Sequence, residues 1–108
     1  MKLLPSLRSQ KRYIVFEIIA PQQFTLSDVA KEVESALLLF LGQLGVSKAA
    51  PLFVKEKYKN NRFIVKVSNR YSDECKAAVI LITTIKNVPV VVKSVATSGT
   101  LKKASARL

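Results

Sequence analysis

The chain has 108 residues, enough for one compact domain, because a domain below roughly 50 residues seldom buries enough apolar surface to be stable. Its 49% hydrophobic and 23% charged residues exclude a wholly disordered or fibrous chain. Eighteen Lys and Arg residues against seven Asp and Glu give a formal net charge of +11. This excess predicts a polyanionic partner, and nucleic acid is the first candidate.

The residue inventory argues against chemistry carried out by the chain itself. There is no histidine, and Cys75 is the single cysteine, so intrachain disulfides, Cys/His zinc sites and Cys/His nucleophile pairs are excluded. We expect no cofactor bound by this chain. The start of the chain lacks the apolar run of a signal peptide, and the longest apolar stretches fall far short of the ~20 residues that cross a bilayer. We therefore expect a cytoplasmic protein without membrane contact.

The predicted elements begin with a basic arm. Residues 1–12 carry several cations and no acid, and we interpret them as an arm that lies on a partner surface. Residues 13–19 are rich in β-branched and aromatic side chains and are followed by Pro21, which predicts a first strand.

A helix follows, and three residues offer N-caps for it: Thr25, Ser27 and Asp28. Its apolar residues recur at helical spacing: Val29, Val33, Leu37, Phe40, Leu41 and Leu44. Gly42 and Gly45 are predicted to end it. The leucine-rich run 36–41 is apolar around more than one face, so the helix either sits in a crowded core or contacts another subunit.

Two strands are predicted at residues 52–58 and 62–67, around a turn at Asn60 and Asn61. Ser68 or Asn69 then caps a second helix, whose predicted buried stripe is Cys75, Ala78, Val79, Ile82 and Ile85. The adjacent acids Asp73 and Glu74 suit the first turn of that helix and need no chemical role. The last strand is predicted at residues 88–95, with Pro89 near its start, before a basic tail at residues 98–108 that has room for a helical turn or two.

The order β-α-β-β-α-β is the split βαβ pattern of α+β ferredoxin-like domains, in which two helices cover one face of a four-stranded antiparallel sheet. We therefore interpret residues 1–108 as a single ferredoxin-like domain with basic extensions at both ends. A buried strand at residues 77–85 is the alternative to the second helix, and the capping residues and the Ala-Ala pair favour the helix.

The same fold carries the RNA recognition motif, but the aromatic signature of that motif is missing from the third strand, where we assign Phe63 to the core. Contact with RNA is therefore expected mainly through phosphates and shape. The candidate RNA-binding residues lie at the two basic ends: Arg8, Lys11, Arg12, Lys93, Ser98, Gly99, Thr100, Lys102 and Lys103. The alternatives are a solvated cationic surface and a plain C-terminal turn. Four further cations at the hairpin suit a charged sheet edge as well as an RNA contact: Lys55, Lys57, Lys59 and Arg62.

Several short segments, in the same order along the chain, resemble the archaeal ribonuclease P protein component 2 family, which includes a eukaryotic ribonuclease P/MRP subunit. They are LPSLR at residues 4–8, KRYI at 11–14, LGQLG at 41–45, KAAP at 48–51 and SGTLKK at 98–103. The resemblance implies a non-catalytic subunit that supports the catalytic RNA in removing the 5′ leader of precursor tRNA, with magnesium held by the RNA. It also implies partners: ribonuclease P RNA, protein component 3 and other subunits, with a possible heterotetramer.

One departure is a C-terminal tail that looks short for the family. The alternative function is a general basic nucleic-acid-binding protein of the ribosome or chromatin. An enzyme such as an acylphosphatase is disfavoured, because no glycine-rich loop closing on an arginine follows the first strand. A small-molecule regulatory domain of the ACT kind is disfavoured by the charge.

Overall fold

A computed structural model describes residues 10–108. Its elements, in chain order, are β1 Lys11–Ile19, α1 Leu26–Ala49, β2 Leu52–Phe53, η2 Lys55–Lys57, β3 Arg62–Ser68, η3 Asn69–Tyr71, α2 Ser72–Ile80, β4 Thr84–Ile85, β5 Val88–Pro89, β6 Val91–Ser98 and α3 Leu101–Ser105. Four strands form one antiparallel sheet in the order β2-β3-β1-β6, and β4 pairs with β5 in a separate hairpin. The predicted α+β ferredoxin-like fold is confirmed.

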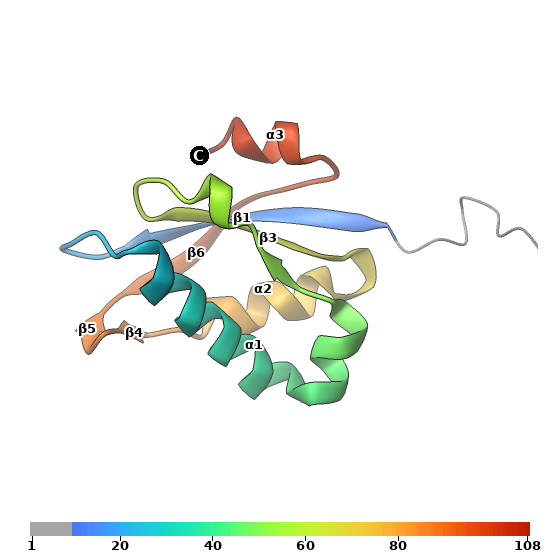
Figure 1. Ribbon diagram of the computed structural model, residues 1–108, viewed down its shortest axis with the longest axis horizontal. Coiled ribbons are helices and arrows are strands. Elements are labelled where there is room, and N and C mark those ends of the chain that lie inside the picture. The colour runs from blue at the N-terminus through green and yellow to red at the C-terminus, as the bar shows by residue number, and fades with distance from the viewer. Residues whose placement is uncertain (1–9) are drawn as a thin grey trace, which may run out of the picture.

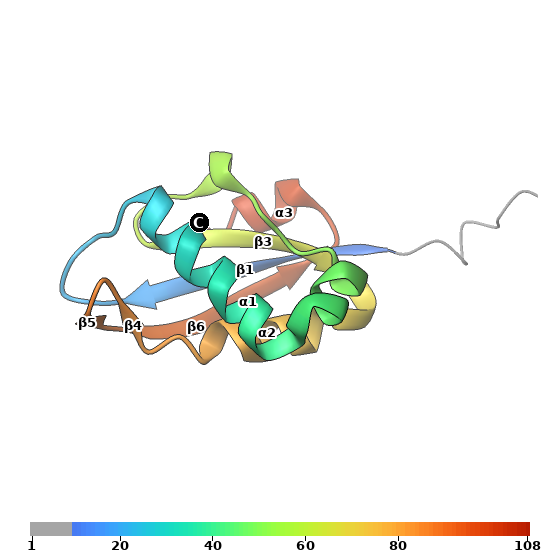
Figure 2. The same cartoon turned by 60° about the horizontal axis from the view of Figure 1, so that its bottom comes forward.

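The sheet separates two layers of unequal size. Helices α1 and α2 cover one face, as predicted, while the short helix α3 and the turn η2 lie over the other (Figure 1). In the second view α1 and α2 lie together in front of the sheet, and α3 lies behind it (Figure 2). The second cover was not predicted as a layer. This layer of α3 and η2 covers a part of the sheet that a ligand could otherwise reach.

The larger core lies between the sheet and α1 and α2. Residues of β1 and β3 alternate across the sheet, so Phe16 and Phe63 are register partners that point to this side. The Phe63 ring stacks between Phe16 and Phe53, with ring centroids 5.2 Å apart in each pair. Phe63 has no exposed surface, which confirms its predicted place in the core.

Helix α1 runs past the predicted end. Its start is as expected, because the Thr25 hydroxyl accepts a hydrogen bond from the Asp28 backbone N–H. Gly42 has φ 73° and ψ 172°, outside the helical region, and bends the chain there. Gly45, however, does not end the helix: the chain resumes helical geometry and continues to Ala49, where Ala50 in the left-handed conformation closes it.

The region after α1 departs from the predicted long strand. Only Leu52–Phe53 pair with β3, and the chain then turns into η2 instead of staying extended to residue 58. Val54 still donates its backbone N–H to the Ile64 carbonyl oxygen at 2.9 Å, and its side chain clusters with Val15, Ile64 and Ala104. The predicted Asn turn is present, with φ 50° at Asn60 and 60° at Asn61.

The second helix and the last strand are confirmed with shifted bounds. Helix α2 occupies Ser72–Ile80, so the helical interpretation prevails over the strand alternative. All five residues of the predicted stripe are buried, but only Cys75, Ala78 and Val79 lie in the helix, whereas Ile82 follows it and Ile85 belongs to β4. Neither Ser68 nor Asn69 caps it, because η3 intervenes. Pro89 belongs to the β4–β5 hairpin, whose turn residues Lys86 and Asn87 have positive φ. The last sheet strand is β6, with an irregularity opposite Val15 and Phe16.

Candidate nucleic-acid interface

Charge divides unequally between two halves of the molecule. We call α1, α2 and the β4–β5 hairpin the helical half; it carries five acids and four cations, namely Asp28, Glu32, Glu34, Asp73, Glu74, Lys31, Lys48, Lys76 and Lys86. The four-stranded sheet with η2, η3, α3 and the loops joining them is the basic half. Its two acids are Glu17 and Glu56, and its twelve cations are Lys11, Arg12, Lys55, Lys57, Lys59, Arg62, Lys66, Arg70, Lys93, Lys102, Lys103 and Arg107. The positive excess of the described residues therefore comes from the basic half.

Helix α3 seals the centre of the second sheet face. Val15 and Ile64 have no exposed surface, and they form a small core with Val54 and Ala104. Thr100 starts α3, since its hydroxyl accepts a hydrogen bond from the Lys103 backbone N–H at 3.3 Å. RNA bases therefore cannot stack on this part of the sheet as they do in the RNA recognition motif.

The open part of that face offers one aromatic ring. Tyr13 lies beside the small core and is half-buried, and the ammonium group of Lys66, its register partner, lies 6.0 Å from the ring centroid.

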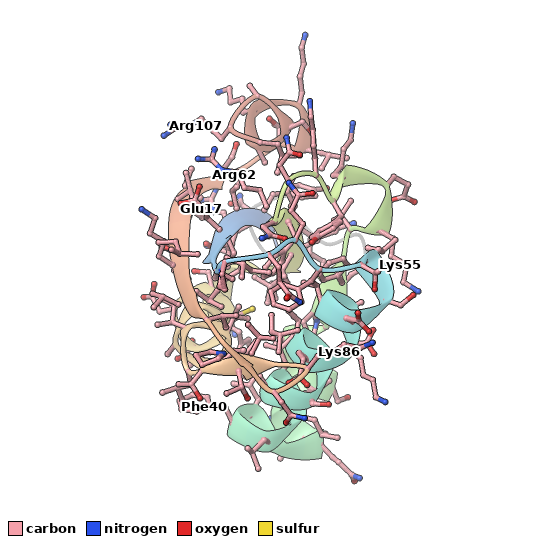
Figure 3. The ribbon with its side chains drawn as sticks, turned by 90° about the vertical axis from the view of Figure 1, so that its left-hand side faces the viewer. Glu17, Phe40, Lys55, Arg62, Lys86 and Arg107 are labelled. Atoms are coloured by element: carbon pink, nitrogen blue, oxygen red, sulfur yellow. The ribbon has the colours of Figure 1, made fainter. Side chains whose placement is uncertain are left out.

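A second cluster joins α3 to the sheet through Glu17. Arg62 donates from Nε and Nη2 to Oε2 of Glu17, at 2.9 and 2.8 Å, and from Nη1 to the Arg107 carbonyl oxygen at 2.6 Å. Lys93 lies 3.5 Å from Oε1 of the same carboxylate. The hydrogen bond from Arg62, with the charge of both cations, lowers the pKa of Glu17. In Figure 3, Glu17 and Arg62 lie directly below Arg107 and α3.

This cluster separates Lys93 from the other candidate RNA-binding residues. Lys93 lies at the middle of β6, where it pairs with Glu17 of β1. Its side chain is 57% exposed, so it can still reach a ligand, but it shares a carboxylate with Arg62. Arg62, the fourth hairpin cation, is committed to structure.

The start of β1 and the turn after β6 lie together at one end of the sheet. The register pairs Tyr13 with Ser98, which brings the first residues of β1 beside the turn after β6. Seven of the nine candidate residues gather there: Lys11, Arg12, Ser98, Gly99, Thr100, Lys102 and Lys103. Lys11 and Arg12, which were expected in the arm, belong to β1 itself, so the strand begins two residues earlier than predicted. Arg8 lies outside the described residues.

At this end of the sheet the guanidinium group of Arg12 is oriented by one side-chain hydrogen bond and lies against Gly99. Its Nε donates a hydrogen bond of 2.9 Å to the Asn69 side-chain oxygen, and a Cβ placed on Gly99 would lie 2.9 Å from Nη1. We call Arg12, Asn69 and Gly99 the sheet corner. Asn69 was predicted only as a helix cap. Its role here depends on a contact across 57 residues of sequence, for which the local pattern gives no signal.

A separate surface on the helical half is apolar. Several large side chains of α1 and α2 and the residue that follows α2 are exposed: Leu38, Leu39, Phe40, Leu44, Ile80 and Leu81. Leu39 is 89% exposed, and a groove of about 400 Å³ runs between α1 and the end of α2. We call these six residues the apolar surface. Much of the leucine-rich run therefore lies outside the core, with Phe40 at the end of the molecule opposite α3 (Figure 3).

The groups able to do chemistry are few. Cys75 is buried, and loss of hydration raises the pKa of its thiol to about 12. Within residues 10–108 no three His, Cys, Asp or Glu side chains come together as metal ligands would. No helix in that stretch combines the length and apolarity needed to span a bilayer.

Comparisons with known proteins agree with this arrangement. The model of the Rpp14/Pop5 family matches residues 12–108. Among curated proteins, the ribonuclease P protein component 2 of Thermococcus kodakarensis is 35% identical over 94% of this chain and 84% of its own length. The protein of the same name from Methanocaldococcus jannaschii is 34% identical over 94% of this chain and 75% of its own length.

A solved structure shares the fold. A chain in the structure of yeast ribonuclease MRP superposes with a TM-score of 0.61 over 94% of this chain and 79% of its own length, at 13% identity. The predicted resemblance to the component 2 family is confirmed by the family match and the curated relatives. The chain belongs to the Rpp14/Pop5 family.

Proposed function

We propose that this chain acts as a non-catalytic protein subunit of ribonuclease P and that its basic half holds the RNA of that particle. The subunit role rests on the family and on relatives named ribonuclease P protein component 2. The observation that carries the RNA-binding role is the division of charge, with twelve cations and two acids in the basic half. Each phosphate that a cation neutralises releases condensed counterions, which favours binding.

The geometry favours contact with the RNA backbone over contact with bases. Helix α3 closes the sheet centre, and Tyr13 is the aromatic ring beside the small core. The cations Lys102, Lys103 and Arg107 lie on or beside α3, with Lys11 at the start of β1. Double-stranded RNA is recognised mostly by shape and by backbone contacts, which such a spread of cations suits.

The remaining parts of the proposal concern the particle. The catalytic groups would be those of the RNA and its magnesium ions, acting on the 5′ leader of precursor tRNA, while this chain supports the folded RNA. The apolar surface would take the protein partner, for which component 3 is the candidate, in a pair that can double into a heterotetramer. The particle would work in the cytoplasm.

The test compares two variants that remove equal charge from the two halves. One replaces Lys11, Lys102, Lys103 and Arg107 by Gln, and the matched control replaces Lys31, Lys48, Lys76 and Lys86 by Gln. Binding of the full chain to a transcript of ribonuclease P RNA from its own genome is measured as a function of salt. The first variant should bind more weakly, with a salt slope smaller by roughly one per lost phosphate contact. The control should keep the wild-type slope.

Equal slopes for the two variants would contradict the assignment of RNA to the basic half. A parallel titration with ribosomal RNA of similar size tests the alternative function. Equal affinity for both RNAs would favour a general nucleic-acid-binding protein, whereas preference for ribonuclease P RNA supports the proposal. Added protein should also increase leader cleavage by the RNA at limiting magnesium.

A further inference from the structure

We propose that the sheet corner is a binding site for one phosphate of the RNA backbone, with Arg12 as the binding residue and Asn69 and Gly99 as positioning residues. The inference rests on the proposed function, which requires RNA on the basic half, and goes beyond it by assigning one built site. Three observations carry it: how Arg12 is held, which of its donors remain, and why position 99 is glycine.

Asn69 orients Arg12 without neutralising it. The amide oxygen of Asn69 accepts from Nε at 2.9 Å, and this oxygen carries no net charge. Among residues 10–108 no Asp or Glu forms an ion pair with Arg12. The guanidinium therefore keeps its full charge and has Nη1 and Nη2 for a ligand.

Arg62 shows the contrasting arrangement. All three of its nitrogens have partners, since Nε and Nη2 donate to Glu17 and Nη1 donates to a backbone carbonyl oxygen. The Glu17 carboxylate compensates its charge, and three of its five N–H groups already have partners, so Arg62 is less suited to an anion than Arg12. Of these two arginines, Arg12 is the one prepared for a ligand and Arg62 is structural.

Gly99 provides the space in which Arg12 lies. A Cβ at position 99 would stand 2.9 Å from Nη1, closer than a Cβ carbon normally comes to another heavy atom in a folded protein. The conflicting atom is the far end of a flexible side chain, so an alanine there would displace the guanidinium and leave the backbone in place. Glycine at this position therefore serves the placement of Arg12.

The chemistry of the site fits a phosphodiester. A planar guanidinium with two parallel donors matches two oxygens of a phosphate, which an ammonium group cannot do. The neighbouring cations Lys11 and Arg70 add positive charge at the same end of the sheet. Bases within an RNA duplex are hard to reach from its deep major groove, whereas phosphates are exposed on every strand.

Three single variants of the full chain test the site. Gly99→Ala displaces Arg12, Asn69→Ala removes its orienting acceptor, and Arg12→Lys keeps the charge but loses the two parallel donors. The probe is the transcript of ribonuclease P RNA used above. Gly99→Ala and Arg12→Lys should each weaken binding by roughly tenfold, as expected for a lost charge-assisted pair, and Asn69→Ala by somewhat less. Lys48→Gln, which removes a cation from an exposed position of the helical half, is the control and should leave affinity unchanged.

A double-mutant cycle shows whether Gly99 acts through Arg12. In the Arg12→Lys background the Gly99→Ala exchange should have little further effect, because the group that it displaces is already gone. Thermal unfolding of each variant is measured alongside. An unchanged melting temperature with weaker binding separates a binding site from a structural contact.

The site is overturned if wild-type protein binds the RNA and both Gly99→Ala and Arg12→Lys bind equally well. Additive effects of the two exchanges would also contradict it, since Gly99 would then act independently of Arg12. A wild-type chain that shows no preference for ribonuclease P RNA, by contrast, would count against the proposed function. The two failures are therefore distinguishable.

Discussion

The two sides of the central sheet bury different numbers of apolar residues. On the side of α1 and α2, one large cluster buries twenty residues, among them Phe16 and Phe63. On the other side, four buried residues and one short helix form a small cluster. The large cluster carries the stability of the fold, whereas α3 is a thin cover that bears cations. The fold can therefore place charge on α3 at little risk to its core.

The largest expected effect is at the centre of the large cluster. Phe63→Ala removes a fully buried ring that stacks between Phe16 and Phe53, so we expect a loss of about 3–5 kcal/mol in the free energy of unfolding. Urea titration followed by circular dichroism measures it. Phe40→Ala is the matched control, since Phe40 is 49% exposed, and it should cost under about 1 kcal/mol. Equal losses would refute the assignment of stability to the large cluster.

A smaller loss of stability is expected when α3 detaches from the sheet. Ala104 is fully buried beneath α3, and Ala104→Glu would place a charge there, so α3 should detach instead of the whole chain unfolding. We expect a loss of about 1–3 kcal/mol, faster amide exchange in residues 100–108, and weaker RNA binding. Ala77→Glu, at an exposed position of α2, is the control. Global unfolding in the first variant would show that the small cluster is part of the main core.

The ion cluster of Glu17, Arg62 and Lys93 ties α3 to the sheet, and it should contribute less to the free energy of unfolding than either apolar cluster. Folding lowers the pKa of Glu17 from its ordinary 4.5, so its contribution is present above that pH and is lost as the pH falls through the lowered value. Glu17→Gln should reduce stability at pH 7 by about 0.2–1 kcal/mol, and the difference from wild type should disappear as the pH falls through the lowered pKa of Glu17. Unfolding curves across pH measure this, with the exposed Glu56→Gln as control. A difference that grows on acidification would contradict the stated direction.

The sequence predicts the large side of the sheet better than the small side. Alternation in β3 places Phe63 in the core, and helical spacing finds Cys75 and Ala78, because these patterns are local. The sequence predicts a helical turn or two in the tail at residues 98–108. The position of that helix over Val15 and Ile64 is not predicted, because it depends on strands that meet only in the folded sheet. The same holds for the sheet corner, since the register of β1 with β6 brings Arg12 to Gly99.

The last prediction is a nearly unchanged rate of thiol labelling, and it tests whether the two sides of the sheet unfold independently. The thiol of Cys75 lies in the large cluster with its pKa raised to about 12 by burial, so it should resist alkylation at pH 8 until the core opens. If α3 detaches alone, Ala104→Glu should label at Cys75 nearly as slowly as wild type, whereas Phe63→Ala should label much faster. Mass spectrometry of the alkylated chain measures the rates. Fast labelling in Ala104→Glu would mean that the small cluster supports the large one, and the cover would then be an integral part of the fold.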